Sequence, residues 1–308
     1  MSARASATLP APTTLAGVGY ALGAFGLWGA FPLYFKAVAS VPAPEVLAHR
    51  VVWSVFWVAL LLCLVGQWRG VGAALRERRR LGMLTVSSLL IATNWLIFIW
   101  AVAADRVLEA SLGYYITPLV SVLLGRIVLG ERLDRLQWIA VALAGAGVAW
   151  TLVGLGSLPW VALGLAATFG SYGLARKVIE VGAIPGLFVE TLVIGPVALA
   201  YLAWLGWRGS GTFGTAGPGF DLLLVAAGIV TAAPLILFAQ AARRLRLASV
   251  GLFQYIVPTA QMLLAVFAFG EAFTAAHAVT FGCIWAGLAL YSGSAWRGRG
   301  GPAPVRET

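Results

Sequence analysis

Charged side chains, and the residues from which catalytic and metal centres are built, are scarce in this sequence. Only 10% of the 308 residues are charged, and the chain has two histidines and two cysteines. Both cysteines, Cys63 and Cys283, lie inside apolar stretches, so we interpret them as small hydrophobic side chains without disulfide or metal partners. With 61% hydrophobic residues and a mean hydropathy of +0.92, the composition excludes an ordinary soluble domain.

Motifs for nucleotide binding and hydrolysis are also missing. The chain has no Walker P-loop, which excludes an ATP-driven pump, and it has neither an HExxH nor a GxSxG sequence. The segment AGAGVAW at 144–150 follows no strand and lacks the third glycine of a dinucleotide fingerprint. An enzyme within the membrane would need a nucleophile paired with a base, or a metal cluster. We therefore predict no enzyme activity, no cofactor and no metal site.

Apolar runs of about 20 residues, separated by short polar breaks, fill the chain instead. A helix of that length crosses the hydrocarbon core of a bilayer. The sequence therefore predicts an all-α polytopic membrane protein with ten transmembrane helices. The expected spans are 15–37, 44–67, 81–104, 109–129, 136–154, 158–177, 184–206, 221–241, 248–269 and 275–296.

The positive charges predict how these spans are oriented. With the N-terminus in the cytoplasm, 16 of the 21 lysines and arginines fall in segments placed inside, Arg176 and Lys177 among them, and 3 fall outside. Such an excess is typical of cytoplasmic loops, so we predict that both termini are cytoplasmic. Topology also explains the net charge of +10, and no nucleic-acid partner is predicted.

Two segments, 109–132 and 249–271, carry the same pattern of tyrosine, proline and a final Gly-Glu. A shift of 140 residues matches 7 of the 17 positions that start at Tyr115, whereas unrelated apolar segments would match at roughly one or two. The identical residues are Tyr115, Ile116, Pro118, Leu123, Leu124, Gly130 and Glu131. We interpret the chain as a first five-helix repeat over 15–154 and a second over 155–296, with tails at 1–14 and 297–308.

An odd number of spans in each repeat requires the second repeat to enter the membrane in the opposite orientation. The loops agree, because the basic RGVGAALRERRR corresponds to the nearly neutral RGSGTFGTAGPGF. Two similar units in opposite orientations can exchange conformations, which opens a midplane site first to one side and then to the other. The alternative is a duplicated membrane scaffold without transport.

The chain resembles the RarD proteins of the EamA branch of the drug/metabolite transporter superfamily over nearly its whole length. The matching stretches are LAHRVVWS (47–54), NWLIFIWAV (94–102), EASLGYYITPLV (109–120), LGERL (129–133), GSLPW (156–160), YGLARK (172–177), VETL (189–192), AAGIVT (226–231), RLRLASVGLFQYIVPT (244–259) and FGCIWAGLAL (281–290). The resemblance implies a ten-helix transporter in the bacterial inner membrane. It supplies no physiological substrate, and Thr117 stands where many relatives have Asn.

Ionisable side chains inside the spans are the first candidates for a site, because each costs roughly 2.5–3.5 kcal/mol to insert. His49 and Glu190 are equivalent at a shift of 141, and we expect both to face the central cavity and to be candidates for proton coupling. Arg50 could hold a carboxylate or pair with an acid. The alternative is that Arg50 and Glu190 extend to opposite membrane surfaces. We interpret Glu131 as an interfacial or capping group.

Polar and aromatic residues in the middle of the third span and around two prolines complete the candidate substrate pathway. Pro118 and Pro258 are hinge candidates, because each removes a backbone donor and frees a carbonyl one turn back. The other pathway candidates are Asn94, Trp95, Tyr114, Tyr115, Gln254, Tyr255 and Gln261. Helix packing is the alternative for each of them. A buried Asn such as Asn94 either bonds a neighbouring helix or faces a cavity.

The expected function is a secondary transporter that exports small metabolites or drugs. An uncoupled facilitator is the nearest alternative. The expected partners are the lipid bilayer, a small organic solute and, through small-residue helix faces, a second copy of the chain. These faces include Ala144, Gly145, Gly282 and Gly287.

Overall fold

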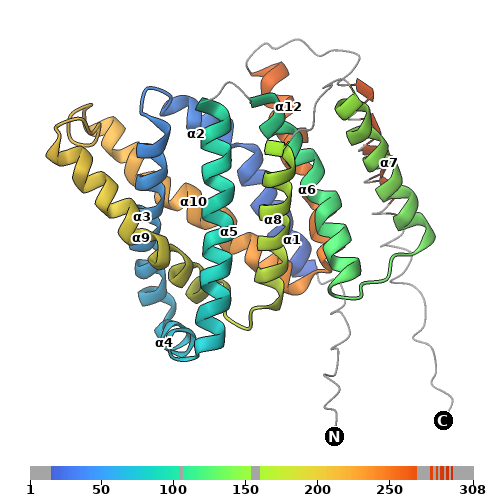
Figure 1. Cartoon of the computed structure of the whole chain (residues 1–308), viewed down its shortest axis with the longest axis horizontal. Helices are drawn as coiled ribbons and strands as arrows, with labels where there is room; N and C mark the ends of the chain where they lie inside the picture. The colour runs from blue at the N-terminus through green and yellow to red at the C-terminus, as the bar shows by residue number, and fades with distance from the viewer. Residues whose placement is uncertain are drawn as a thin grey trace, which may run out of the picture.

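The computed structural model is a bundle of helices, with no strand in the part of the chain that it describes (Figure 1). That part is residues 15–103, 107–153, 160–268 and a few separate residues between 278 and 293. The helices are α1 (Leu15–Gly29), α2 (Phe31–Ala37), α3 (Ala43–Val65), α4 (Trp68–Arg76), α5 (Arg78–Ala103), α6 (Val107–Ile127), α7 (Arg135–Val153), α8 (Trp160–Val178), α9 (Ala183–Trp207), α10 (Pro218–Arg244), α11 (Leu247–Phe253) and α12 (Ile256–Phe267).

These helices occupy the first nine expected spans. Six segments are long and apolar enough to cross a membrane by themselves, which makes the chain a multi-pass membrane protein. Those segments are 15–37, 43–65, 78–98, 183–207, 218–244 and 247–264. The tenth expected span, 275–296, and the two tails lie mostly or wholly outside the described residues.

The first span is broken between α1 and α2, which the sequence analysis treated as one helix. Pro32 lies in the first turn of α2 and has no N–H to donate to the carbonyl of Trp28, four residues back. The side-chain amide of Gln261 on α12 donates to that carbonyl at 3.4 Å. Gln261 therefore satisfies a carbonyl that a proline leaves unpaired in the other half of the chain.

The ninth span is broken as well, at Gln254 and Tyr255 between α11 and α12. Pro258 cannot donate to the carbonyl of Gln254, and the backbone N–H of Val257 donates to it instead at 3.0 Å. This tighter turn ends one helix and starts the next. The segment with the same sequence pattern, α6, continues through Pro118 without a break.

A short helix that the sequence analysis did not predict, α4, follows the second span. Gly66 ends α3 in the left-handed conformation, with φ of +66°. The next residues then form α4, which buries Val71 and Ala74 against the bundle and packs on α9. Hydropathy alone does not detect α4, because its nine residues are mixed in polarity.

Aromatic side chains fill the centre of the main core. Phe238 on α10 stacks on Tyr172 on α8, with ring centroids 5.8 Å apart, and contacts Phe25 and Trp28 on α1. At another place in the bundle, a Cβ on Gly287 would lie 2.7 Å from the Ala140 carbonyl. Part of the small-residue face is therefore used for packing within one chain.

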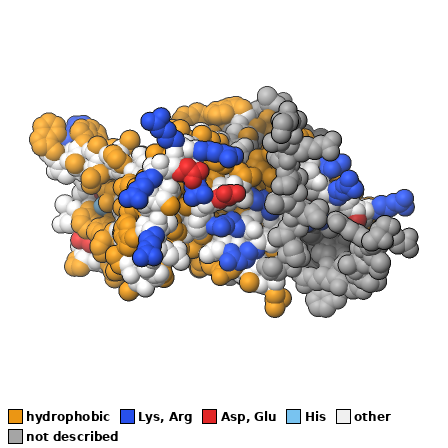
Figure 2. Space-filling view, turned by 90° about the horizontal axis from the view of Figure 1, so that it is seen from below, with side chains coloured by type: hydrophobic (Ala, Val, Ile, Leu, Met, Phe, Trp, Pro, Cys, Tyr) orange, Lys and Arg blue, Asp and Glu red, His pale blue; other side chains and the backbone are white. Residues whose placement is uncertain are grey.

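One end of the bundle carries a concentration of basic side chains, visible when the molecule is seen from below (Figure 2). Contacts join four loops at this end. They are Arg80 with Glu180 at 4.0 Å, Lys177 with Glu131 at 3.8 Å, Arg243 with the Val181 carbonyl at 2.5 Å, and Arg246 with the Arg132 carbonyl. These four connections therefore lie on one face of the bundle, the arrangement expected if all four are on the same side of the membrane.

Candidate functional site

Arg50 lies between the two halves of the chain, surrounded by aromatic rings. Its guanidinium carbon is 5.1 Å from the ring centroid of Trp95 on α5, and 5.5 Å and 5.9 Å from those of Phe35 and Phe31 on α2. Its Nε donates a hydrogen bond of 2.9 Å to the Thr231 hydroxyl on α10. We call Arg50, Phe31, Phe35, Trp95 and Thr231 the Arg50 cluster.

Two phenols also lie near the guanidinium. Tyr34 on α2 and Tyr114 on α6 both interact electrostatically with Arg50. The Tyr34 hydroxyl donates to the Leu223 carbonyl at 3.1 Å and so joins α2 to α10. Elements from both halves of the sequence therefore converge on one arginine.

His49 faces a different environment from its neighbour Arg50, because successive side chains of a helix point about 100° apart. Its Nδ1 accepts a hydrogen bond of 3.2 Å from the Trp53 indole, and its ring lies 5.3 Å from that of Phe213. Its Nε2 is 3.9 Å from the carboxylate of Glu45, which in turn accepts hydrogen bonds from Thr212. His49 thus packs against the loop between α9 and α10.

Glu190 is buried in a third place, where it forms an ion pair with Arg176. The Arg176 Nη1 lies 3.3 Å from the Glu190 carboxylate, and the Ser87 hydroxyl donates to the same carboxylate oxygen at 2.5 Å. Ser88 donates to the Glu190 carbonyl at 2.6 Å, and Tyr172 lies close by. Arg176 and Glu190 are only 1% and 2% exposed, so neither extends to a membrane surface.

A glycine makes room for this pair. A Cβ added to Gly186 on α9 would lie 2.4 Å from the Arg176 Nη1 and 2.8 Å from its Nη2. Gly186 is one helical turn before Glu190, so the guanidinium lies flat against the α9 backbone and reaches the carboxylate from there. The sequence analysis counted Arg176 among the loop charges, and the structure buries it within α8.

Asn94 and Trp95 are neighbours on α5 with different partners. The Asn94 amide donates to the Leu165 carbonyl and to the Thr168 hydroxyl on α8, both at 3.0 Å. Asn94 therefore bonds a neighbouring helix, the first of the two expectations stated for it. Trp95 belongs to the Arg50 cluster.

The tyrosines that suggested the repeat are in contact. The Tyr255 hydroxyl donates to the Tyr115 carbonyl at 3.1 Å, and Tyr255 is fully buried. Gln254 is also buried, and its side-chain oxygen has no hydrogen-bond partner in the described part of the protein. The Thr117 hydroxyl bonds back to the Gly113 carbonyl of its own helix at 2.7 Å.

Glu131 caps a helix of the other half of the chain. Its two carboxylate oxygens accept hydrogen bonds from the backbone N–H groups of Leu247 and Ala248, at 2.7 and 3.0 Å, at the start of α11. A carboxylate at this position satisfies unpaired N–H groups and complements the helix dipole. The interpretation of Glu131 as a capping group agrees with these bonds.

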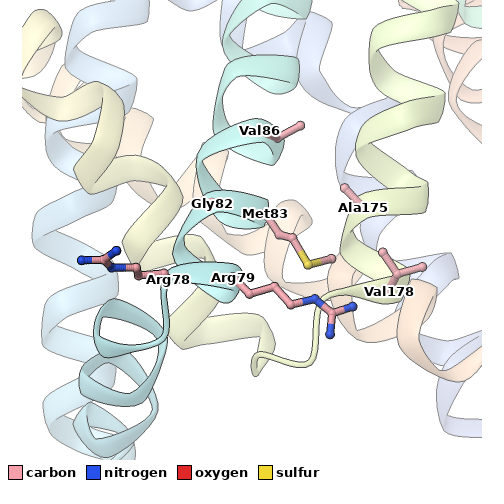
Figure 3. Close-up of a pocket in the computed structure, with 7 residues that line it drawn as sticks. All are labelled: Arg78, Arg79, Gly82, Met83, Val86, Ala175 and Val178. Atoms are coloured by element: carbon pink, nitrogen blue, oxygen red, sulfur yellow. The ribbon is translucent and has the colours of Figure 1, made fainter. Parts of the chain in front are cut away.

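A pocket of about 360 Å³ opens at the basic end between α5 and α8 (Figure 3). Arg79 and Met83 extend toward α8 in this view, whereas Arg78 points away from the others. None of the residues expected to form the substrate pathway lines the pocket.

The expected site residues thus do not form one site. Arg50, His49 and Glu190 lie in three separate clusters, and the other expected residues, except Trp95 and Tyr114 near Arg50, lie elsewhere in the bundle: Asn94, Tyr115, Gln254, Tyr255 and Gln261. Residues that sequence reasoning missed are Phe31, Tyr34, Phe35, Ser87 and Arg176. The aromatic run FPLYF at 31–35 beside a proline was the available signal for three of them.

Comparisons with known proteins give a consistent result. Residues 15–153 match the EamA-like transporter family. The chain is 50% identical over 276 residues to an uncharacterized transporter of Vibrio cholerae, covering 90% of this chain and 91% of that protein. It is 49% identical over 283 residues to protein RarD of Salmonella typhi, covering 92% of this chain and 96% of that protein.

A solved crystal structure has a similar fold. It superposes with a TM-score of 0.71 at 21% identity, covering 92% of this chain and 100% of the other chain. Identity at this level shows the fold alone.

Proposed function

Because the chain belongs to the RarD-type proteins of the EamA-like transporter family, we propose that it is a secondary transporter that exports small metabolites or drugs by alternating access. Relatives of the chain are named as transporters. One observation carries the mechanistic part of the proposal: the hydrogen bond from the Tyr255 hydroxyl to the Tyr115 carbonyl.

Tyr115 and Tyr255 are 140 residues apart, which is the shift that relates the two proposed repeats. Equivalent residues of two units related by a two-fold axis can touch only if both lie close to that axis. The helix boundaries add support, because α3, α5 and α6 start at 43, 78 and 107, and α9, α10 and α11 start at 183, 218 and 247. The family match over 15–153 has the length of one repeat.

The difference between α6 and its equivalent supports an exchange of conformations. One repeat holds this segment as a continuous helix, and the other holds it broken before Pro258. In the opposite state of the transporter, α6 would bend near Pro118 and the α11–α12 segment would straighten. The substrate pathway would pass between them, beside Trp95, Tyr114 and Arg50.

Energy for export would come from the substrate gradient or from protons. We keep His49 and Glu190 as the proton-coupling candidates. The ion pair adds a condition for Glu190, because a proton on its carboxylate would leave the buried Arg176 without a counter-charge. Coupling through Glu190 therefore requires Arg176 to find another partner or water in the protonated state.

Cysteine labelling tests alternating access without knowledge of the substrate. In a chain with Cys63 and Cys283 replaced by alanine, Trp95→Cys should react with a membrane-impermeant maleimide from either side of a vesicle. Leu96→Cys, one residue further along α5, is the matched control. Leu96 is 64% exposed and would face lipid, so it should react from neither side.

The outcomes separate the alternatives. A Trp95→Cys that reacts from neither side favours a packed scaffold, and one that reacts from a single side contradicts alternating access. Flux of a metabolite panel into proteoliposomes, with and without a pH gradient, then distinguishes a proton-coupled exporter from an uncoupled facilitator.

The proposal includes the topology and the assembly. The basic end would face the cytoplasm, with both termini there. A second copy of the chain could pack on the remaining small residues, because a Cβ on Gly145 or Gly282 would meet nothing within 4 Å. Crosslinking of Gly145→Cys in native membranes would test this contact.

A further inference from the structure

Arg50 is a membrane-embedded cation without an acidic partner among the residues that the structure describes. The structure describes seven acidic side chains, Glu109 of α6 not being among them, and each of the seven contacts another group. Glu45 contacts His49 and Thr212, Glu77 and Glu180 contact Arg80, Glu131 caps α11, Asp134 binds the Gln137 N–H, Glu190 pairs with Arg176, and Asp221 binds the Gly214 N–H. An unpaired charge in a span is costly and marks a functional position.

The groups around Arg50 attract a cation but supply no anion. The ring faces of Trp95, Phe35 and Phe31 hold the guanidinium by cation–π contacts. The Thr231 hydroxyl accepts from Nε. The other titratable groups that act on Arg50 are the phenols of Tyr34 and Tyr114, which are neutral near pH 7.

One edge of the guanidinium therefore remains available. The Arg50 Nε donates to Thr231. The two Nη groups of Arg50 bond to no side chain or carbonyl in the described part of the protein. Two parallel N–H groups are the geometry that arginine uses to bind a carboxylate with two hydrogen bonds. The bond to Thr231 restrains the rotation of this edge, so the fork is held in position.

We propose that the Arg50 cluster binds the carboxylate of a small organic anion, whose apolar or aromatic part lies against Trp95, Phe35 and Phe31. This inference rests on the proposed transport function and names its substrate class. A single cation suits a single negative charge, and a phosphate ester with two charges would need a second cation. The rings add stacking and apolar contact for the rest of the molecule.

Thermal stabilisation of the full-length protein in detergent tests the proposal with three matched probes: 3-phenylpropionate, its neutral amide and 3-phenylpropylamine. A ligand that binds the native state raises Tm by mass action. At millimolar concentration, we expect the carboxylate to raise Tm by about 2–4 °C and the other two to raise it much less. Arg50→Gln should abolish the carboxylate shift.

Two further variants serve as controls. Arg126→Gln removes an exposed arginine near the end of α6 and should keep the full shift. Arg50→Lys keeps the charge but loses the two parallel N–H groups, so the Tm shift produced by the carboxylate should fall by at least half. This variant keeps the proposal testable where Arg50→Gln folds poorly. Equal shifts for the carboxylate and the amide, a shift retained in Arg50→Gln or Arg50→Lys, or no carboxylate shift at all would each overturn the proposal.

The binding result and the transport result are separable. A carboxylate shift that depends on Arg50, with no flux of the same probe into proteoliposomes, would leave the anion site in place and contradict transport of that probe. Flux of cations or neutral solutes that is insensitive to Arg50→Gln would support transport and contradict the anion site.

Discussion

Two arginines within the helix bundle, the half-buried Arg50 and the fully buried Arg176, are held in opposite ways. Arg176 in α8 has a carboxylate 3.3 Å away, and Gly186 leaves space for its planar head. Arg50 in α3 has three aromatic rings and one hydroxyl around it, and no carboxylate among the described residues. The charge of Arg176 is neutralised by Glu190 within the fold. The charge of Arg50 is available to the carboxylate of the proposed substrate.

The contrast shows how a membrane protein can use the same side chain for structure and for binding. A buried ion pair with further hydrogen bonds fixes the relative position of helices, here α5, α8 and α9. A cation held by ring faces and one neutral hydroxyl is restrained in place while its charge stays available. The two arginines should therefore respond to substitution in opposite ways.

The largest effect is expected from breaking the ion pair. Arg176→Met leaves the Glu190 carboxylate buried without a counter-charge, which should lower the free energy of unfolding by about 3–5 kcal/mol. Unfolding of the purified protein in micelles measures this. The double variant Arg176→Met, Glu190→Leu should recover most of the loss, and a double variant as unstable as the single one would show that the charge is not the cause.

A smaller effect is expected from filling the space beside the pair. Gly186→Ala would place a Cβ 2.4 Å from Arg176 Nη1 and should cost about 1–3 kcal/mol of stability. Gly206→Ala on the same helix is the control, since a Cβ added there would meet nothing within 4 Å. Because alanine favours the helix, the control should be neutral or more stable. Equal effects of the two changes would contradict the prediction.

Removing the hydroxyl that holds Arg50 should have a modest effect. Thr231→Val deletes the acceptor of the 2.9 Å bond and should lower stability by about 1 kcal/mol. We expect the Tm shift produced by 3-phenylpropionate to fall more than stability does, because the fork loses its fixed orientation. A variant that binds the carboxylate normally would show that the aromatic rings alone orient Arg50.

The smallest effect on stability is expected at Arg50 itself. Arg50→Gln removes a charge that has no acidic partner in the described part of the chain, so the free energy of unfolding should change by less than about 1 kcal/mol or should rise. The same unfolding assay that reports the loss in Arg176→Met measures this. A loss as large as that of Arg176→Met would mean that Arg50 is a structural ion-pair residue.

The sequence predicted helices at the first nine expected spans, and six of these segments are long and apolar enough to cross a membrane by themselves, because the length and polarity of an apolar run decide whether a helix can cross the bilayer. It did not predict the breaks before Tyr255 and after Gly29, which depend on where the carbonyls freed by Pro258 and Pro32 find donors. It also missed α4, which depends on the turn at Gly66.

For the candidate site, sequence indicated which residues matter but not their partners. Arg50, Trp95 and Glu190 were identified by charge and polarity within spans. The ion pair was missed because hydropathy places Arg176 at the end of an apolar run, where it was counted as a loop charge. In the structure, the short turn between α8 and α9 brings α9 back alongside α8, and Arg176 faces Glu190. The contact between Tyr255 and Tyr115 could not be predicted from the repeat. An alignment shows which residues of two repeats correspond, but not how far apart they lie in the folded protein.

The short separation of Arg176 and Glu190, 14 positions along the chain, also has a consequence for biosynthesis. The two charges lie on consecutive helices, so they can meet as soon as that hairpin leaves the ribosome and can pass from the insertion machinery into lipid already neutralised. Arg50 has no such neighbour and must enter with its charge bare, at a cost of roughly 2.5–3.5 kcal/mol. The apolar residues around Arg50 make that insertion favourable, because the span 43–65 that contains it reaches a mean hydropathy of 1.9.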